Sequence, residues 1–286
     1  MRPILLLAPD GLVSATVHRL LERAGYGVTV CHDELPSLSA VRFRRPTLIV
    51  LAVPAARARA VCLALKTDPV TSRIPVVQMR DESAMDRLTA EPDAVFADLS
   101  PPRFLAAVTA AIAVQRSRTR EGVHADLRLR VPSDAGELNP LNDCLRGWSA
   151  ACGLTALGVH QLTLAVHELV ANSMEWGHRY QRSRPVRLHG RLDVEKVSVL
   201  VSDSGPGFDR YNLPHAARPG DPVSHLRVRA AMHLRDGGFG ILMARGLVDH
   251  LCYNEAGTEG LIIQYLRQPR QRPARSGYHL LTDHPG

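Results

Sequence analysis

Residues 201–210 read VSDSGPGFDR and place a carboxylate and two glycines at the end of an apolar run. The run itself, KVSVLVS (196–202), has the pattern of a strand that ends at Asp203. A carboxylate at a strand end can accept a hydrogen bond from an exocyclic amine. Gly205 and Gly207 allow the backbone to turn sharply and to lie close to a planar ring. Taken alone, the segment is more typical of a surface turn, so its function depends on the flanking sequence.

The segment LTLAVHELVANSMEWGH (162–178) has the periodicity of a helix. We expect one arc of this helix to face a core: Leu162, Val166, Leu169, Val170 and Ser173. Glu168 and Asn172 are four residues apart and share the other face, with Glu175 beside them. A carboxylate can accept a proton from a hydroxyl, and an amide oxygen is a hard ligand that suits Mg²⁺. A solvated helix face is the alternative interpretation of this pair.

Downstream, the segment LRDGGFGILMARGLVDHL (234–251) predicts a glycine-rich loop that opens a helix. Gly237, Gly238 and Gly240 would leave free N–H groups and a positive helix end for phosphates, unless the loop is a plain helix start. It is neither a Walker loop nor a dinucleotide fingerprint, because the Gly-Lys-Ser/Thr and the βαβ order are missing. A buried stripe is predicted for the helix: Ile241, Leu242, Leu247, Val248 and Leu251. The following YNEAGTEGLIIQYL predicts a hairpin, with Thr258 just after a turn glycine.

In this order and spacing, the segments resemble the GHKL (Bergerat) ATP-binding domain over residues 127–266. Glu168 and Asn172 match the asparagine box of that family. Asp203, Gly205 and Gly207 match its first glycine box, and Gly237, Gly238 and Gly240 match its second. Thr258 matches the threonine that often supports adenine recognition in the family. Within this family, the chain is most similar to the anti-sigma-factor serine kinases. The segments that carry this similarity are RLRVPSDAGELNPLNDCLRGW, HELVANSMEWGH and GFGILMARGLVDHLCYNEAGTE. Within the first of these, Ser133 or Asp134 is expected to cap a helix that runs to about residue 151.

The resemblance implies a C-terminal α/β sandwich, the Bergerat fold, that binds ATP and Mg²⁺. Asp203 would receive the adenine amino group, Asn172 would hold Mg²⁺, and Glu168 would be the general base that deprotonates a serine of a partner protein. Residues 209–236 would form a lid over the nucleotide, and the 237–240 loop would wrap the phosphates. The implied partners are an anti-sigma-factor antagonist, a sigma factor and a second copy of the chain.

Three departures from the family pattern lie in or near these motifs. Trp176 stands where the asparagine helix usually carries His, and Pro206 separates the glycines of the first glycine box. The lid is rich in basic side chains: His215, Arg218, His225, Arg227, Arg229, His233 and Arg235. None of these departures removes the adenine carboxylate or the metal-binding amide.

Residues 1–115 alternate short apolar runs with helix-period segments, which predicts a parallel sheet covered on both faces. The expected strands are PILLLA, TLIVLAV, IPVVQM and AVFADL, and the expected helices span 12–24, 56–67 and 102–115. RRPTLIVLAVP and CLALKTDPVTSRIPVVQM resemble a response-regulator receiver domain, which implies a flavodoxin-like fold. Unrelated flavodoxin-like domains share the same rhythm.

The chemistry of a receiver domain is missing from this region. Ala52 aligns with the phospho-acceptor Asp, and only Asp10 remains of the acidic pair that holds Mg²⁺. Arg80 aligns with the hydroxyl residue, and Asp98 falls near the position of the conserved Lys. Because phosphoryl transfer to a carboxylate needs the nucleophile itself, we interpret residues 1–115 as a degenerate receiver used for dimerisation or docking.

The 286 residues carry a net charge of +7, and six of these charges fall in residues 116–130 and 267–286. Residues 116–126 are predicted to be a basic linker and residues 267–286 a disordered tail rich in Pro and Arg. Balanced charge elsewhere argues against a specific nucleic-acid module and leaves only weak contact of linker or tail with nucleic acid or anionic lipid. No apolar run spans a bilayer, and the five scattered cysteines suit a reducing compartment, so we expect a cytoplasmic protein without a membrane segment.

Three functions are compatible with these patterns. The favoured one is an ATP-dependent serine protein kinase of anti-sigma type. The second is a nucleotide-dependent module that sequesters a partner without phosphoryl transfer. A histidine kinase is disfavoured because the short segment 116–126 leaves no room for a helical hairpin around His124.

Overall fold

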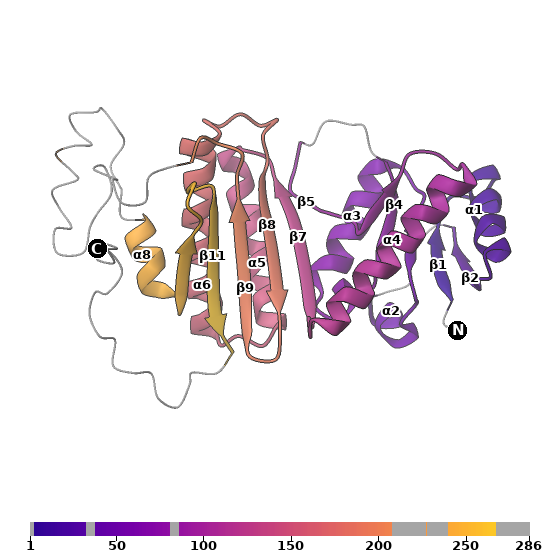
Figure 1. Cartoon of the computed structure of the whole chain (residues 1–286), viewed down its shortest axis with the longest axis horizontal. Helices are drawn as coiled ribbons and strands as arrows, with labels where there is room; N and C mark the ends of the chain where they lie inside the picture. Colours follow the sequence, from indigo (N-terminus) through magenta and orange to yellow (C-terminus); the bar gives the residue numbers. More distant parts are fainter. Residues whose placement is uncertain (1–2, 33–37, 81–85, 208–226, 228–239, 267–286) are drawn as a thin grey trace, which may run out of the picture. The chain divides into compact units, whose positions relative to one another are not determined.

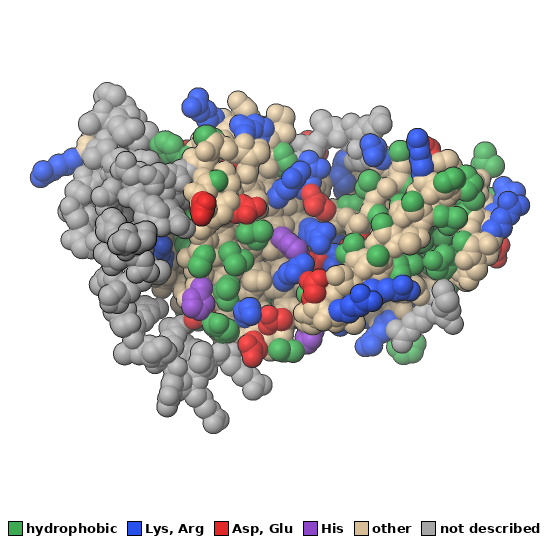
Figure 2. Space-filling view, in the orientation of Figure 1, with side chains coloured by type: hydrophobic (Ala, Val, Ile, Leu, Met, Phe, Trp, Pro, Cys, Tyr) green, Lys and Arg blue, Asp and Glu red, His purple; other side chains and the backbone are tan. Residues whose placement is uncertain are grey.

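The computed structural model describes residues 3–32, 38–80, 86–207, 227 and 240–266. It divides into two compact units, residues 1–131 with 189–194 and residues 132–188 with 195–286. Within the described ranges, no helix combines the length and the apolar character that crossing a bilayer requires. On the face drawn in Figure 2, basic and acidic side chains of the described residues are interspersed.

The first unit is built on a parallel five-stranded sheet, as the alternation of apolar runs predicts. Its strands are β1 (Ile4–Leu7), β2 (Val28–Cys31), β3 (Ile49–Leu51), β4 (Val76–Met79) and β6 (Ala94–Phe96). The order is β2-β1-β3-β4-β6, the order of one common type of doubly wound α/β sheet. Leu6 lies opposite both Val30 and Val50, which fixes the register of the three strands at one edge. Strand β2 was not among the predicted strands, because VTVC is too short to stand out from its surroundings.

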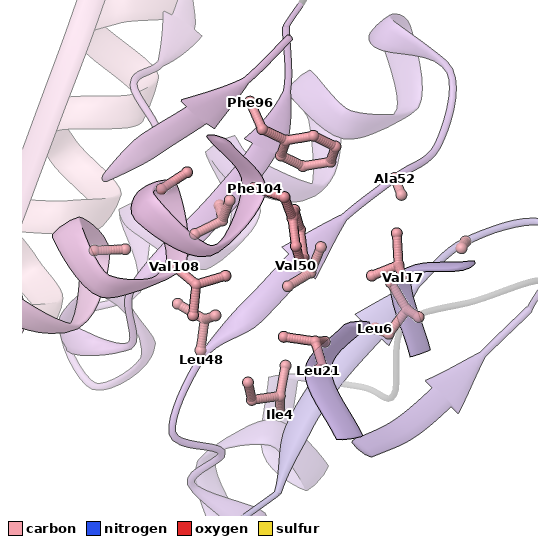
Figure 3. Close-up of a cluster of buried hydrophobic side chains, with 14 residues drawn as sticks. Ile4, Leu6, Val17, Leu21, Leu48, Val50, Ala52, Phe96, Phe104 and Val108 are labelled. Carbon is pink, nitrogen blue, oxygen red and sulfur yellow. The ribbon is translucent and has the colours of Figure 1, made fainter. Parts of the chain in front are cut away.

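Helices cover both faces of this sheet (Figure 1). They are α1 (Leu12–Arg23), α2 (Leu38–Arg44), α3 (Ala55–Thr67) and α4 (Pro101–Arg120). Val17 and Leu21 of α1 and Phe104 and Val108 of α4 meet the sheet in one buried apolar cluster (Figure 3). Ala52 belongs to the same cluster and is 2% exposed, so the position aligned with a phospho-acceptor is packed with apolar side chains.

The segment 116–126, predicted as a linker, is largely regular structure. Helix α4 continues to Arg120, and strand β7 (Ala125–Val131) begins five residues later. Arg118 and Asp126 are 4% and 1% exposed and form an ion pair with each other. Arg118 also lies 2.5 Å from Asp93, which in turn lies 2.6 Å from Lys66. The composition suggests a solvated connection, but Arg118 and Asp126 are buried in ion pairs that the sequence pattern does not show.

Strand β7 pairs in antiparallel fashion with the short strand β5 (Thr89–Ala90), and Ala90 lies opposite Leu129. The other neighbour of β7 in the sheet is β8 (Val186–Leu192). Residues 189–192 of β8 belong to the first unit, as β7 does.

The second unit joins an antiparallel sheet to a layer of helices (Figure 1). Its strand order is β10-β11-β9-β8, with β9 (Lys196–Ser202), β10 (His250–Tyr253) and β11 (Glu259–Tyr265). Its helices are the 3₁₀ turn η2 (Ala135–Glu137), α5 (Leu138–Ala151), α6 (Ala156–Asn172), the π-helical turn η3 (Ser173–Gly177) and α8 (Gly240–Leu247). Helix α6 packs against α5, α8 and the strands β9 and β11. This arrangement is the predicted two-layer α/β unit, with alternate residues Val197, Val199 and Val201 of β9 buried.

Two local predictions can be compared with the second unit. Asp134, not Ser133, caps the helical start, and its side chain accepts the N–H of Gly136 at 2.7 Å. The stripe predicted after Gly240 is split, because α8 ends at Leu247 and Leu251 belongs to β10. Ala244 is the buried residue of α8, whereas Ile241, Leu242 and Leu247 are half-buried.

Candidate functional site

Helix α6 carries Glu168 and Asn172 on a half-exposed face. The opposite face is buried as predicted through Leu162, Val166 and Val170, each fully buried. Thr155 begins the helix by accepting the N–H of Gly158 at 3.1 Å. The apolar face therefore anchors α6 on the sheet, and the two polar side chains remain directed away from that contact.

The helix does not stop at Asn172 but continues as the single π-helical turn η3. Such turns are rare and are often found at functional sites. Gly177 ends this turn and lies directly against Gly205, because a Cβ on Gly205 would come within 2.5 Å of the Cα of Gly177. Only two residues without side chains can meet this closely, so the end of η3 and the turn after β9 form one backbone contact.

Asp203 stands at the end of β9, where its backbone N–H donates to the carbonyl of Thr258 at 3.0 Å. Its Oδ1 accepts the N–H of Gly205 at 2.7 Å, which closes a tight turn. A Cβ on Gly177 would lie 2.8 Å from that same Oδ1. The carboxylate is thus held between the end of β9 and the end of η3.

The second glycine of this turn contacts the hairpin between β10 and β11. Gly207 has φ +71°, and a Cβ there would run into the carbonyl of Ala256 and lie 3.2 Å from Cγ2 of Thr258. Asn254 holds the hairpin, because its Oδ1 accepts the N–H of Thr258 at 3.0 Å and its Nδ2 donates to Oγ1 of Thr258 at 3.1 Å. Asp203, Gly205, Gly207 and Thr258 therefore come together as one corner.

Glu168 contacts a different glycine. A Cβ on Gly240, the first residue of α8, would collide with the Glu168 carboxylate. Glu168 and Gly177 are nine residues apart along α6 and η3, which is roughly 13 Å at helical rise. The Asp203 corner and the Glu168–Gly240 contact thus mark the two ends of an elongated site, with Asn172 between them. Gly237, Gly238 and almost all of 209–236 lie outside the described residues; Arg227, the exception, is exposed.

Sequence reasoning missed His178, which is fully buried directly after η3. Its Nε2 lies 3.0 Å from the backbone nitrogen of Ser204, and its Nδ1 lies 2.8 Å from Oγ of Ser133. A backbone N–H can only donate, so Nε2 must accept and the neutral ring carries its proton on Nδ1. Ser133 accepts that proton and donates its own to the carbonyl of Arg184 at 2.6 Å.

The environment of His178 favours this neutral form. Burial lowers the pKa of His178; the nearby Asp203 carboxylate opposes this shift, and the Arg184 guanidinium reinforces it. Protonation would also place a second N–H against the N–H of Ser204. The sequence WGH after the asparagine helix was the visible sign of this residue, but its partners at 133, 184 and 204 are distant in sequence.

In the described part of the chain, no group of three or more His, Cys, Asp or Glu side chains could hold a metal ion by itself. A magnesium ion bound by one protein amide together with phosphate oxygens and waters needs no such group. Asn172 therefore fits a metal that arrives with a nucleotide and does not fit a metal cage made by the protein alone.

Comparison with known proteins defines the class of this site. Residues 131–264 match the family model of the histidine kinase-like ATPase domain, a range that contains the described candidate residues from Glu168 to Thr258. The predicted GHKL-type domain is thereby confirmed over this range.

The C-terminal half is also weakly homologous to curated proteins named serine-protein kinase RsbW. Those of Oceanobacillus iheyensis, Listeria monocytogenes and Bacillus subtilis are 20%, 21% and 23% identical over 143, 147 and 145 residues. The alignments cover 50%, 51% and 50% of this chain and 87%, 90% and 88% of those relatives.

Proposed function

We propose that the chain is an ATP-binding regulatory protein that transfers the γ-phosphate of Mg-ATP to a serine of a partner protein. The observation that carries this proposal is the corner in which Asp203, Gly205, Gly207 and Thr258 meet beside Gly177. The match to an ATPase domain and the likeness to serine-protein kinases support it.

The Asp203 corner fits an adenine ring. Oδ1 already accepts the N–H of Gly205, and Oδ2 can accept the exocyclic amine of the base. Gly177, Gly205 and Gly207 let the backbone pack closely around the carboxylate, which fixes the position of Asp203 for the base. Thr258 is held at this corner by Asn254, which donates to its hydroxyl, and its methyl group lies beside Gly207.

Asn172 and the loop that leads to Gly240 would serve the phosphates. The side-chain oxygen of Asn172 would hold Mg²⁺, which would offset phosphate charge, and the N-terminus of α8 would favour the same negative charge. Gly237, Gly238 and the lid 209–236 are proposed to complete this part of the site.

Glu168 would act as the general base. Its carboxylate is half-exposed at the start of α8, at the phosphate end of the site and away from the adenine corner. It would accept the proton of the attacking serine hydroxyl while the metal and the helix N-terminus stabilise the charge on the transferred group.

The proposed partner is an anti-sigma-factor antagonist that carries the serine, with a sigma factor as a second ligand and a homodimer as the working form. We propose residues 127–266 as the kinase domain and residues 1–115 as a degenerate flavodoxin-like receiver that docks or dimerises. The apolar surroundings of Ala52 support the loss of phospho-acceptor chemistry in the latter.

The test is a phosphorylation assay on a cognate antagonist with the wild-type protein and with Glu168→Ala. We expect the variant to bind Mg-ATP like the wild type and to lose phosphate transfer. Glu175→Ala is the control: Glu175 lies in the π-helical turn η3 that continues the same helix, and this variant should retain activity. Transfer by Glu168→Ala at the wild-type rate would contradict the assigned base. A wild-type protein that binds ATP and captures its partner without transfer would be a binding module.

A further inference from the structure

Ser204, between Asp203 and Gly205, is held by polar contacts at each of its polar groups. Its N–H donates to Nε2 of His178 at 3.0 Å, and its Oγ lies 3.2 Å from the same nitrogen. Its carbonyl accepts a hydrogen bond from Nη2 of Arg184, which lies 3.3 Å from Oγ. The residue next to the proposed adenine carboxylate is therefore held from one side by a buried histidine and an arginine.

Both holding residues come from the segment that follows the asparagine helix. After His178, Arg179 and Tyr180 adopt φ of +51° and +55°, a region that non-glycine residues seldom occupy. The N–H of Tyr180 returns to the carbonyl of Met174 at 2.8 Å, and the N–H of Arg184 returns to Gln181 at 2.9 Å. This reversal brings the Arg184 side chain to the same serine that His178 contacts.

We propose that His178 is a positioning residue for nucleotide binding: its unprotonated Nε2 holds the Ser204 N–H and thereby fixes the Asp203–Gly205 turn that receives adenine. The inference rests on the proposed ATP site and adds a residue outside the glycine and asparagine boxes. His178 touches no substrate; it acts through Ser204. Ser133 completes the arrangement, because it accepts the Nδ1 proton and so holds the tautomer that leaves Nε2 free to accept.

The arrangement has a pH dependence that a purely packing role lacks. A doubly protonated ring would direct an N–H at the N–H of Ser204 and release the turn. The charged groups that face His178 are Asp203, which favours protonation, and Arg184, which opposes it. Nucleotide affinity should therefore fall as pH decreases below the usual titration range of histidine.

Two substitutions separate the Ser204 contact from simple packing. His178→Gln places an amide oxygen near the position of Nε2 and preserves the acceptor for Ser204. In His178→Asn the side chain is shorter: its amide can reach Ser133 but not Ser204, so the Ser204 N–H loses its partner. His160→Asn, an exposed histidine on α6, is the control for loss of an imidazole.

The experiment measures ATP affinity of the full chain by calorimetry at pH 7.5, with thermal melting of each variant. We expect His178→Asn to bind ATP about tenfold more weakly, in line with the loss of one part-buried hydrogen bond that holds the turn. His178→Gln and His160→Asn should remain close to the wild type. Equal affinity of His178→Asn and wild type would overturn the inference, as would equal losses in the Asn and Gln variants.

A measurement on the wild type covers the case in which His178→Asn does not fold. The ¹⁵N shifts of the His178 ring should show the Nδ1–H tautomer, and their titration should share its midpoint with the loss of ATP affinity. His178→Gln should lack that component of the pH profile. A protonated ring or the Nε2–H tautomer at pH 7.5 would overturn the inference. Wild-type protein that binds no ATP would contradict the proposed function itself, whereas normal binding with an insensitive His178 would contradict only the positioning role.

Discussion

The carboxylate of Asp203 lies against the backbone of Gly177, so that a Cβ on residue 177 would stand 2.8 Å from Oδ1 and 3.0 Å from Cγ. Asp203 directly follows strand β9, and Gly177 ends the π-helical turn after the asparagine helix. Their contact joins two motifs that are distant in the sequence, and it places the Asp203 carboxylate at the end of the helical run that carries Glu168 and Asn172.

Gly177→Ala should therefore weaken ATP binding by about tenfold or more, because the added methyl group displaces the Asp203 carboxylate or the Gly205 backbone. Calorimetry with Mg-ATP measures the effect. Gly147→Ala is the matched control, since a Cβ there meets no atom within 4 Å on an exposed face of α5. If Gly177→Ala binds ATP as tightly as Gly147→Ala, the close contact is irrelevant to the nucleotide.

Gly207→Ala should lower both ATP affinity and thermal stability, since it combines a φ of +71° with a collision against the Ala256 carbonyl. Gly25→Ala has a comparable strain, φ +84°, but open space around the Cβ. This control should cost about 1 kcal/mol of stability and leave ATP binding unchanged. The prediction fails if the two variants lose the same stability and both retain full affinity.

Most of the second unit could be predicted from its sequence, because the periodicity and residue types within each motif are enough to indicate its secondary structure. Val166 and Val170 mark the buried face of α6 by periodicity, and Asp203 closes an alternating strand. His178 could not be assigned in this way, because its role depends on Ser133 and Ser204, which the fold brings together from distant segments. Arg118 and Asp126 were assigned to a linker for a similar reason: burial of these charges is favourable because Arg118 pairs with both Asp126 and Asp93, which is distant in sequence.

Asp126→Asn should destabilise the first unit by about 3 kcal/mol, because among the described ion pairs Asp93 is then the one carboxylate left to balance the two buried cations Lys66 and Arg118. Urea unfolding followed by circular dichroism measures the loss. Asp98→Asn is the control, since the Asp98–Arg103 pair at 2.9 Å is exposed to solvent. A loss no larger than that of the control would show that the buried pairs contribute little.

The same carboxyl predicts a dependence of stability on acid. Burial alone would raise the pKa of Asp126, but the hydrogen bond with His189 and the charges of Arg118 and Arg128 outweigh it and hold the pKa at about 2. A depressed pKa stabilises the folded state above the usual value near 3.8, and this contribution is lost as pH falls toward 2. Wild type and Asp126→Asn should therefore converge in stability between about pH 4 and pH 2. A constant difference over that interval would contradict the assignment.

The central claim is that Asp203 receives adenine, and the affinity of Asp203→Asn for Mg-ATP tests it most directly. The asparagine oxygen can still accept the N–H of Gly205, so the turn and the melting temperature should be retained. Its amide nitrogen would face the exocyclic amine as a second donor, and ATP binding should be abolished. A folded Asp203→Asn protein that binds ATP with undiminished affinity would contradict the site.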